Sequence, residues 1–278
     1  MRPIDGVTSI TRRVPKAPPK GAAAGATDTL GKTILQFSGQ VALYLGHLWR
    51  TIKGIKGVRW GMVVESCAAT GIEAIPILLL IGFLMGLILA MQAAEQLRQF
   101  GASIFVADLV GVAMAREIGP LITGILVAGR SASGFAAEIG AMRINEEVDA
   151  LETMGFDPHR YLFTPKVLAT IMVMPFLTLV TDSIGAFGGY VIGVSNLHIS
   201  TRAYLQETQH AVKTADVVNG LAKAAIFGLI ISLVGSVKGF LVVRGAPEVG
   251  RAARAAVVLS IILIIIADAI FTVIFHGG

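Results

Sequence analysis

Five long apolar stretches constrain the fold of this 278-residue chain more than any other feature of its sequence. They cover approximately residues 75–94, 118–141, 167–194, 224–243 and 255–275. Each reaches the roughly 20 residues that a helix needs to cross the hydrocarbon core of a bilayer. Helices satisfy their own backbone hydrogen bonds in lipid, and the alternating pattern of a β-barrel is absent from the sequence. We therefore expect an all-α integral membrane protein with about five transmembrane helices.

The composition supports this class of protein. Apolar residues make up 54% of the chain and charged residues 15%, whereas about a quarter of the residues in a soluble protein are charged. These proportions exclude a disordered chain, a soluble enzyme with a solvated surface and a secreted disulfide scaffold. The single cysteine, Cys67, forms no disulfide within the chain, and the sequence holds no cluster of metal-binding side chains. We expect neither a metal site nor a catalytic residue in this chain.

The residues before the first apolar stretch divide into two parts. Residues 1–29 are basic and rich in proline, which predicts a disordered tail; an organelle transit peptide is the alternative. Residues 30–60 carry apolar side chains at steps of three or four from Leu30 to Ile55, with basic and amide side chains between them. This pattern predicts an amphipathic helix in the membrane interface, with a helix of a small soluble domain as the alternative. Residues 61–278 then form the transmembrane domain.

Lysine and arginine counts predict the orientation of the chain. If the N-terminus is cytoplasmic, the inside segments 1–64, 142–166 and 238–254 hold 17 of the 23 basic residues, and the outside segments 95–117 and 195–223 hold 5. Basic residues accumulate on the cytoplasmic side of membrane proteins. We therefore expect a cytoplasmic N-terminus and, because the number of spans is odd, a C-terminus on the outer side.

Small residues recur at every fourth position in two of the stretches, which allows helices to approach each other closely. We interpret these rows as packing within one bundle, with a homodimer seam as the alternative for a minority of them. The rows consist of Gly124, Ala128, Ala132, Ala136 and Gly140 in the second stretch and Gly185, Gly189 and Gly193 in the third.

Four charged residues are candidates for a functional site inside the membrane, where a charge that faces lipid costs at least a few kcal/mol. Asp182 and Asp268 lie deepest in their stretches. Arg116 and Glu117 lie at the outer mouth of the second stretch, directly before a Gly-Pro pair that should bend the helix. We expect these four residues to line a polar pathway, and structural ion pairs between helices are the alternative.

An acidic segment, residues 143–158, follows the second stretch. Its apolar residues share one face of a helix, Gly155 is typical of the position after a helix end, and Pro158 prevents continuation. We expect a short, rigid amphipathic helix whose apolar face binds a protein partner, because an acidic helix gains nothing from anionic headgroups; packing on the chain's own helix ends is the alternative. The residues assigned to this role are Arg143, Ile144, Glu146, Glu147, Val148, Asp149, Leu151, Glu152, Met154 and Gly155.

Several segments of the sequence together resemble one family. They are AREIGP at 115–120, VAGR at 127–130, EIGAMR at 138–143, EEVDALETMGFDP at 146–158 and VGRAARAAVVLS at 249–260. These segments resemble the MlaE/YrbE family, the permease subunits of MCE-associated ABC transporters. The resemblance covers roughly residues 30–278 and leaves out the first 29.

The resemblance implies a homodimer in the bacterial inner membrane that moves phospholipid, or a related lipid, between this membrane and a periplasmic MCE-domain hexamer, as in systems that maintain outer membrane lipid asymmetry. Two ATPase subunits would bind ATP and Mg on the cytoplasmic side, so the chain itself would need no cofactor. Helix 143–155 would be the coupling helix in the ATPase cleft, and Arg116 and Glu117 match the family's charged pair near the lipid cavity. Some systems add a small STAS-domain subunit, and nucleic acid is not an expected partner.

Two other functions fit the residues without the resemblance. A secondary transporter would couple proton movement to its cargo through Asp182 and Asp268. A scaffold without transport activity would anchor a complex through its small-residue faces. The acidic helix argues against the secondary transporter, because that mechanism has no use for a rigid docking helix.

Overall fold

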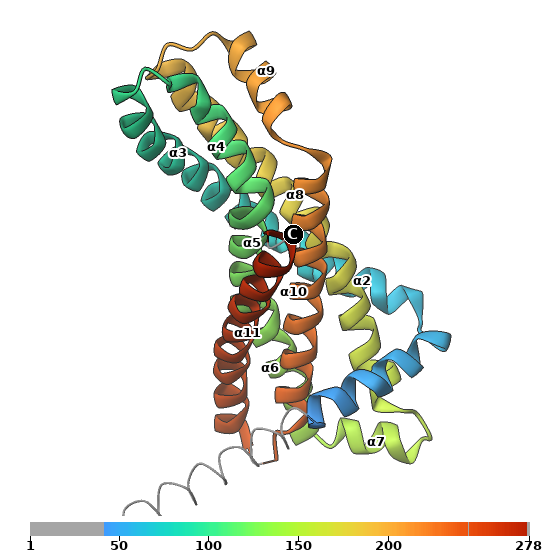
Figure 1. Cartoon of the computed structure of the whole chain (residues 1–278). Helices are drawn as coiled ribbons and strands as arrows, with labels where there is room; N and C mark the ends of the chain where they lie inside the picture. Colours follow the sequence, from blue (N-terminus) through green and yellow to red (C-terminus); the bar gives the residue numbers. More distant parts are fainter. Residues whose placement is uncertain (1–41, 244, 277–278) are drawn as a thin grey trace, which may run out of the picture. The chain divides into compact units, whose positions relative to one another are not determined.

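The computed structural model describes residues 42–243 and 245–276, and every regular element in this part of the chain is a helix (Figure 1). The chain divides into a unit Met1–Leu43 and a unit Tyr44–Gly278. The predicted tail over 1–29 and residues 30–41 of the predicted amphipathic helix lie outside the described residues.

The fold of the second unit is a series of long helices joined by short helical connections. In chain order the elements after residue 54 are η1 (Ile55–Gly57), α2 (Trp60–Gly71), η2 (Ile72–Ala74), α3 (Ile75–Gln99), η3 (Ser103–Phe105), α4 (Val106–Ala113), η4 (Met114–Ile118), α5 (Gly119–Val127), η5 (Ala128–Ala132), α6 (Ser133–Ile144), α7 (Glu147–Thr153), η6 (His159–Phe163), α8 (Thr164–Ser195), α9 (Thr201–Ala211), α10 (Thr214–Phe240) and α11 (Gly245–His276).

Five of these segments are long and apolar enough to cross a membrane, which confirms the predicted all-α membrane fold. They are Trp60–Gln99, Ser103–Ile144, His159–Ser195, Thr214–Phe240 and Gly245–Ile274. Helix α7 lies between the second and third spans, and α9 lies between the third and fourth. Because consecutive spans alternate in direction, these two helices lie at opposite ends of the bundle, which we call the α7 end and the α9 end (Figure 1).

The helical segments that form the spans are longer than the apolar stretches of the sequence, and two of them begin earlier in the chain than predicted. The second begins at Ser103 rather than near residue 118, so Arg116 and Glu117 lie within this helical segment and not at its start. The fourth begins at Thr214 rather than near residue 224, which places Lys223 inside the span and not in an outer loop. The physical reason is that these charged side chains are paired within the bundle, so apolar content alone underestimates the length of a span.

The row of small residues in the third span packs within the bundle, as predicted. A side-chain carbon added at Gly185 would overlap Met114, and one at Gly86 of α3 would overlap the carbonyl group of Gly185. Gly189 and Gly193 face the ring of Tyr204 in α9. Helices α3 and α8 can approach this closely only because glycine presents backbone at the contact.

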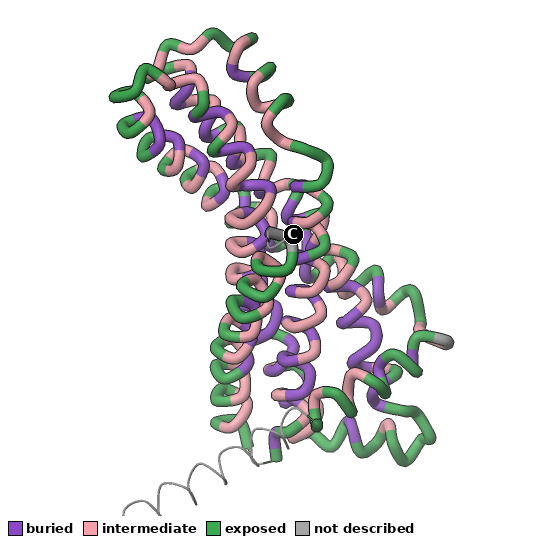
Figure 2. Tube along the Cα trace, in the orientation of Figure 1, coloured by how far each residue is buried: buried purple, intermediate pink, exposed green. Residues whose placement is uncertain are grey.

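The small row of the second span packs in the same way, and its members lie in the purple, buried centre of the bundle (Figure 2). Ala132 and Ala136 lie against Gly235 and Gly239 of α10. A second row of small residues on this span, Gly129, Ser133, Ala137 and Ala141, is partly or fully exposed, and a side-chain carbon added at Gly129 would have no neighbouring atom within 4 Å. One small row therefore forms the core, and a second faces outward.

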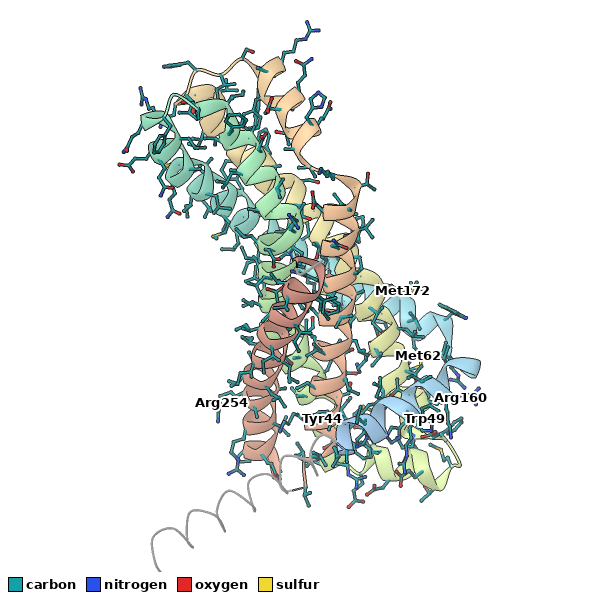
Figure 3. All side chains as sticks on the ribbon, viewed as in Figure 1. Tyr44, Trp49, Met62, Arg160, Met172 and Arg254 are labelled. Atoms are coloured by element: carbon teal, nitrogen blue, oxygen red, sulfur yellow. The ribbon has the colours of Figure 1, made fainter. Side chains whose placement is uncertain are left out.

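The described part of the predicted amphipathic segment is helical over residues 42–54, which we call the N-terminal helix. Its contact face is formed by His47, Thr51 and Gly54, which pack on the start of the third span. Trp49, labelled in Figure 3, and Ile52 are 60% and 48% exposed. Exposed apolar side chains on this helix are consistent with a membrane interface, and that placement stays a prediction.

Candidate functional site

A buried lysine joins two of the four charged residues predicted for the pathway. Lys223 on α10 is 2% exposed at its side chain, and its Nζ donates a hydrogen bond of 2.6 Å to Oε2 of Glu117 in η4. The same Nζ lies 3.0 Å from Oδ1 of Asp268 on α11. Thr272, one turn further along α11, donates a 3.0 Å hydrogen bond to Oε1 of Glu117. One cation and two carboxylates thus connect the second, fourth and fifth spans; we call Glu117, Lys223, Asp268 and Thr272 the Lys223 cluster.

Arg116 is not a member of this cluster although it adjoins Glu117 in the chain. Its Nε lies 3.3 Å from Oδ1 of Asp216 in the first turn of α10. Arg116 and Glu117 belong to a π-helical segment directly before Pro120, and π-helical turns often occur at functional sites. Successive side chains on a helix point in different directions. The predicted charged pair therefore contacts two separate partners on one neighbouring helix.

Asp182 does not contact the Lys223 cluster and lies beside a cavity. Its carboxylate lies against Gly119, and its Oδ1 is buried without a hydrogen-bond partner among the described residues. The side chain lines a cavity of about 390 Å³ together with Ala115, Thr208 and Val217. The structure thus brings Glu117 and Asp268 together through Lys223, and it leaves Asp182 and Arg116 outside that contact.

Lys223 is the residue that sequence reasoning missed. The apolar pattern predicts a fourth span that begins near Ala224, which leaves Lys223 in the polar outer segment 195–223. A signal was nevertheless present, since Lys223 is followed without interruption by the apolar run Ala224 to Leu229. A lysine that directly precedes such a run is expected to be inside the membrane or at its edge.

Two further ion pairs join neighbouring spans. Arg130 in η5 pairs with Glu73 of η2 and donates a hydrogen bond of 3.3 Å to the carbonyl oxygen of Ala69. Lys166 in α8 donates a 2.6 Å hydrogen bond to Glu138 in α6. Both pairs are positioned to hold the second span against its neighbours.

The acidic helix is shorter than predicted. Helix α6 continues through Arg143 and Ile144, and α7 begins only at Glu147. Glu146 adopts a left-handed conformation with φ 60°, which ends the regular helical path between the two. The break was hidden in the sequence, because glutamate favours helices and gives no sign of this turn. Arg143 instead pairs with Asp149 across the break.

The apolar face of α7 is partly covered by the chain itself, which is the packing that was the alternative to a partner-binding face. Val148 is fully buried in a cluster with Ile139 and Phe163, and Leu151 packs on the same cluster. Met154 is 63% exposed and follows the helix. The exposed surface of α7 is therefore acidic. Its carboxylates belong to Glu146, Glu147, Asp149 and Glu152.

A pair of histidines joins the N-terminal helix to the segment that follows α7. Nδ1 of His47 and Nε2 of His159 are 2.7 Å apart, and the His47 ring stacks on Phe163 at a centroid distance of 5.4 Å. Such a hydrogen bond needs one nitrogen as donor and the other as acceptor, so at least one ring is neutral. Burial, His159 and Arg50 lower the pKa of His47 from 6.5 to about 4.

We expect the N-terminal helix to loosen in mild acid. Because the pKa of His47 is lower in the folded protein than its ordinary value, this contact stabilises the fold fully above about pH 6.5 and loses that contribution as the pH falls toward 4. Hydrogen exchange of the backbone amides of residues 45–54, corrected for intrinsic rates, should accelerate between pH 7 and pH 5. His47→Phe should remove most of this dependence, and equal protection at both pH values in the wild type would contradict it.

Comparisons with known proteins identify the family to which this chain is similar. Residues 63–274 match the model of the permease MlaE family. A probable ABC transporter permease protein of Rickettsia felis is 36% identical over 250 residues, which cover 89% of this chain and 96% of that protein. The intermembrane phospholipid transport system permease protein MlaE of Haemophilus influenzae is 28% identical over 90% of this chain and 97% of its own length. The chloroplastic protein TRIGALACTOSYLDIACYLGLYCEROL 1 of Arabidopsis thaliana is 32% identical over 89% of this chain and 69% of its own length.

Proposed function

The chain belongs to the MlaE permease family, and we propose that it is the membrane subunit of an ATP-driven transporter of phospholipid or a related lipid. A relative named as a phospholipid transport permease supports this cargo. We place this multi-pass membrane protein in the bacterial inner membrane with its α7 end in the cytoplasm, because the segments at that end hold most of the basic residues.

The observation that carries this proposal is the exposed acidic surface of α7 on a helix whose other side is anchored. Four residues with carboxylates on or directly before α7 are exposed, whereas Val148 is 0% exposed. A separate ATPase subunit with a basic cleft would fit this surface by charge, and ATP and Mg²⁺ would bind to that subunit. The chain itself would then perform no catalysis.

The anchoring of α7 gives a route for force. Val148 lies in one cluster with Ile139 at the end of the second span and Phe163 at the start of the third. Closure of the ATPase subunits would press on α7, and tightly packed side chains transmit such a displacement. We propose that the second and third spans move together in response and change the space available to the lipid.

The other partners are proposed from the resemblance to the family. We propose a homodimer, with the outward-facing small row that includes Gly129 as a contact surface. A periplasmic MCE-domain hexamer would exchange lipid at the α9 end, and a STAS-domain subunit would accompany the ATPase in some systems. The pathway would run past Arg116 and the Lys223 cluster.

A proton-coupled secondary transporter has less support. Asp268 is paired with Lys223 and is not available as a lone proton carrier. Asp182 remains a single buried carboxylate beside a cavity. Neither observation explains an anchored acidic helix outside the membrane spans.

The double substitution Arg116→Gln with Glu117→Gln should weaken lipid recovery with the purified complex. Each substitution removes an ion pair that positions charge along the proposed pathway, Arg116 with Asp216 and Glu117 with Lys223, so we expect about a tenfold loss of bound phospholipid. Thin-layer chromatography or mass spectrometry measures the amount of bound phospholipid per protein. Light scattering should still report two copies of the chain in the complex.

The matched control is Arg202→Gln with Glu207→Gln on α9, which also removes one positive and one negative charge. It should leave lipid recovery unchanged. If both double variants retain as much lipid as the wild type, Arg116 and Glu117 are structural residues and not part of a lipid site.

A further inference from the structure

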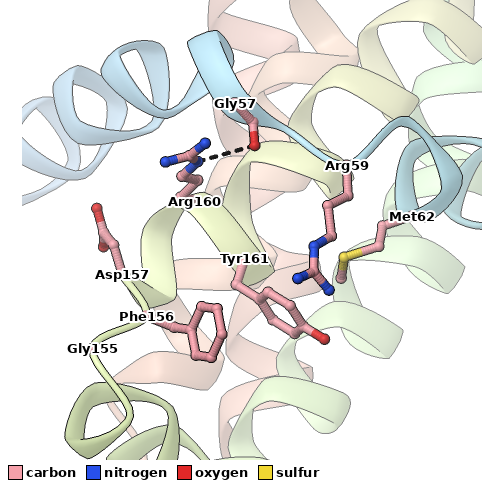
Figure 4. Close-up of a pocket in the computed structure, with 8 residues that line it drawn as sticks. All are labelled: Gly57, Arg59, Met62, Gly155, Phe156, Asp157, Arg160 and Tyr161. Atoms are coloured by element: carbon pink, nitrogen blue, oxygen red, sulfur yellow. Dashed lines mark hydrogen bonds between the residues drawn. The ribbon is translucent and has the colours of Figure 1, made fainter.

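A cavity of about 290 Å³ lies at the α7 end, between the start of the first span and the segment that follows α7 (Figure 4). Arg59 and Met62 line it on one side, and Phe156, Arg160 and Tyr161 line it on the other. It is far along the chain from the Lys223 cluster and shares no residue with it. The mechanism proposed above does not use it.

The two arginines bring positive charge that the protein leaves uncompensated. Arg160 donates a 3.0 Å hydrogen bond from Nε to the carbonyl oxygen of Gly57, which fixes its guanidinium group and leaves the terminal nitrogens for another partner (Figure 4). The guanidinium of Arg59 lies over the ring of Tyr161 at 5.7 Å. In the part of the chain that the structure describes, no ion pair joins either arginine to a carboxylate.

The single carboxylate that lines the cavity, Asp157, is already engaged. Its Oδ1 accepts a 3.0 Å hydrogen bond from the backbone N–H of His159 and lies 3.4 Å from Nδ1 of the same residue. These contacts hold the Asp157 carboxylate toward His159, and one carboxylate against two guanidinium groups leaves the lining of the cavity with a net positive charge. A ligand that fits the cavity would therefore place a negatively charged group next to the two arginines.

The position of the cavity selects the kind of anion. Arg59 directly precedes the first span, and Arg160 is the second residue of the third, so both lie where a span meets water. The exposed side chains of Trp49 and Trp60 mark the same level, since tryptophan is enriched at the membrane interface. Met62 and the half-exposed ring of Phe156 add an apolar wall beside the charges.

We propose that this cavity binds the phosphate of an anionic phospholipid headgroup from the adjacent leaflet, with Arg59 and Arg160 as its ligands. Guanidinium groups suit phosphate because they offer several parallel N–H donors. The apolar wall would contact the first carbons of the acyl chains. The bound lipid would hold the segment after α7 against the start of the first span, and would be separate from transported lipid.

The test uses the full chain reconstituted in nanodiscs of three parts phosphatidylcholine to one part phosphatidylglycerol. Native mass spectrometry after mild detergent release measures the ratio of retained phosphatidylglycerol to phosphatidylcholine. Arg59→Gln with Arg160→Gln should lower this ratio about 25-fold, since a basic residue near an anionic membrane contributes about a fivefold preference. Arg98→Gln with Arg202→Gln, two exposed arginines nearer the α9 end, is the matched control and should change it little.

Single substitutions distinguish a loss of lipid binding from a folding defect of the double variant. Arg59→Gln removes a guanidinium group that stacks on Tyr161 and forms no ion pair within the described residues, and it should alone lower the ratio about fivefold. Arg160→Lys keeps one positive charge and should retain more phosphatidylglycerol than Arg160→Gln. Inorganic phosphate added at millimolar concentration should not displace the lipid.

Three results would overturn the proposal. The first is an unchanged lipid ratio in the double arginine variant, or an equal loss in the control. The second is complete displacement by inorganic phosphate, which would make the site one for soluble anions. The third is loss of the ATPase partner from the double variant with lipid retention intact, which would make the cavity a protein-docking surface. Total lipid bound near Arg116 is a separate quantity, so this proposal and the proposed function can fail independently.

Discussion

Replacing Lys223 by methionine is expected to destabilise the protein more than any other single substitution in its spans. The side chain is 2% exposed, and its removal leaves Glu117 and Asp268 without their cation inside the membrane domain. Removing one partner of a buried ion pair costs about 3–5 kcal/mol. The effect is measured as a lower unfolding temperature of the detergent-solubilised protein. Samples are heated, and the height of the monodisperse peak in size-exclusion chromatography reports the folded fraction.

Two further variants separate this explanation from a simple packing defect. Lys223→Met combined with Glu117→Gln and Asp268→Asn should recover much of the stability, because a buried ionic network can often be replaced by neutral groups at little cost. Lys166→Met is the matched control, because its partner Glu138 is 53% exposed and water can solvate the carboxylate left behind. If Lys166→Met and Lys223→Met unfold at the same temperature, the Lys223 cluster is not a stabilising network.

Reversing two charges on α7 is expected to release the ATPase subunit. Glu147 and Glu152 are exposed, and neither forms an ion pair within the described residues, so their replacement by lysine leaves the fold of α7 intact. Like charges then face the basic cleft of the partner. Retention of the ATPase during purification should fall by more than about tenfold, in the range expected for the loss of interfacial charge pairs.

The control for this reversal is Glu95→Lys with Glu207→Lys, which changes the net charge equally near the α9 end. It should leave ATPase retention unchanged. Asp149 is deliberately kept, because it pairs with Arg143 and its reversal would also disturb the break between α6 and α7. An ATPase that remains bound to Glu147→Lys with Glu152→Lys would show that the acidic surface is not its docking site.

The fold was predictable from sequence where a local pattern determines it. Five spans follow from apolar length, and the packing of the rows that contain Ala132 and Gly185 follows from small residues at every fourth position. The predicted boundaries were less accurate. Charges paired within the bundle, such as Arg116 with Asp216, make a buried helix appear polar in the sequence.

The site was predictable only in part, because its contacts join residues far apart in the chain. Glu117, Lys223 and Asp268 come from three different spans, and no spacing within one helix reveals that they meet. The π-helical segment at Met114–Ile118 and the left-handed Glu146 are likewise set by packing rather than by residue preference. An amphipathic pattern identified α7, but it gave no indication of which surface would cover Val148.

The most direct measurement of the central claim is site-specific photo-crosslinking from α7 in native membranes. A photoreactive amino acid at Glu152, which is exposed on the acidic surface, should produce one major adduct with an ATPase subunit, identified by mass spectrometry. The same probe at Glu207 on α9 should produce none with that subunit. If the probe at Glu152 reacts only with lipid or with this chain itself, α7 is not the place where an ATPase acts on the transporter.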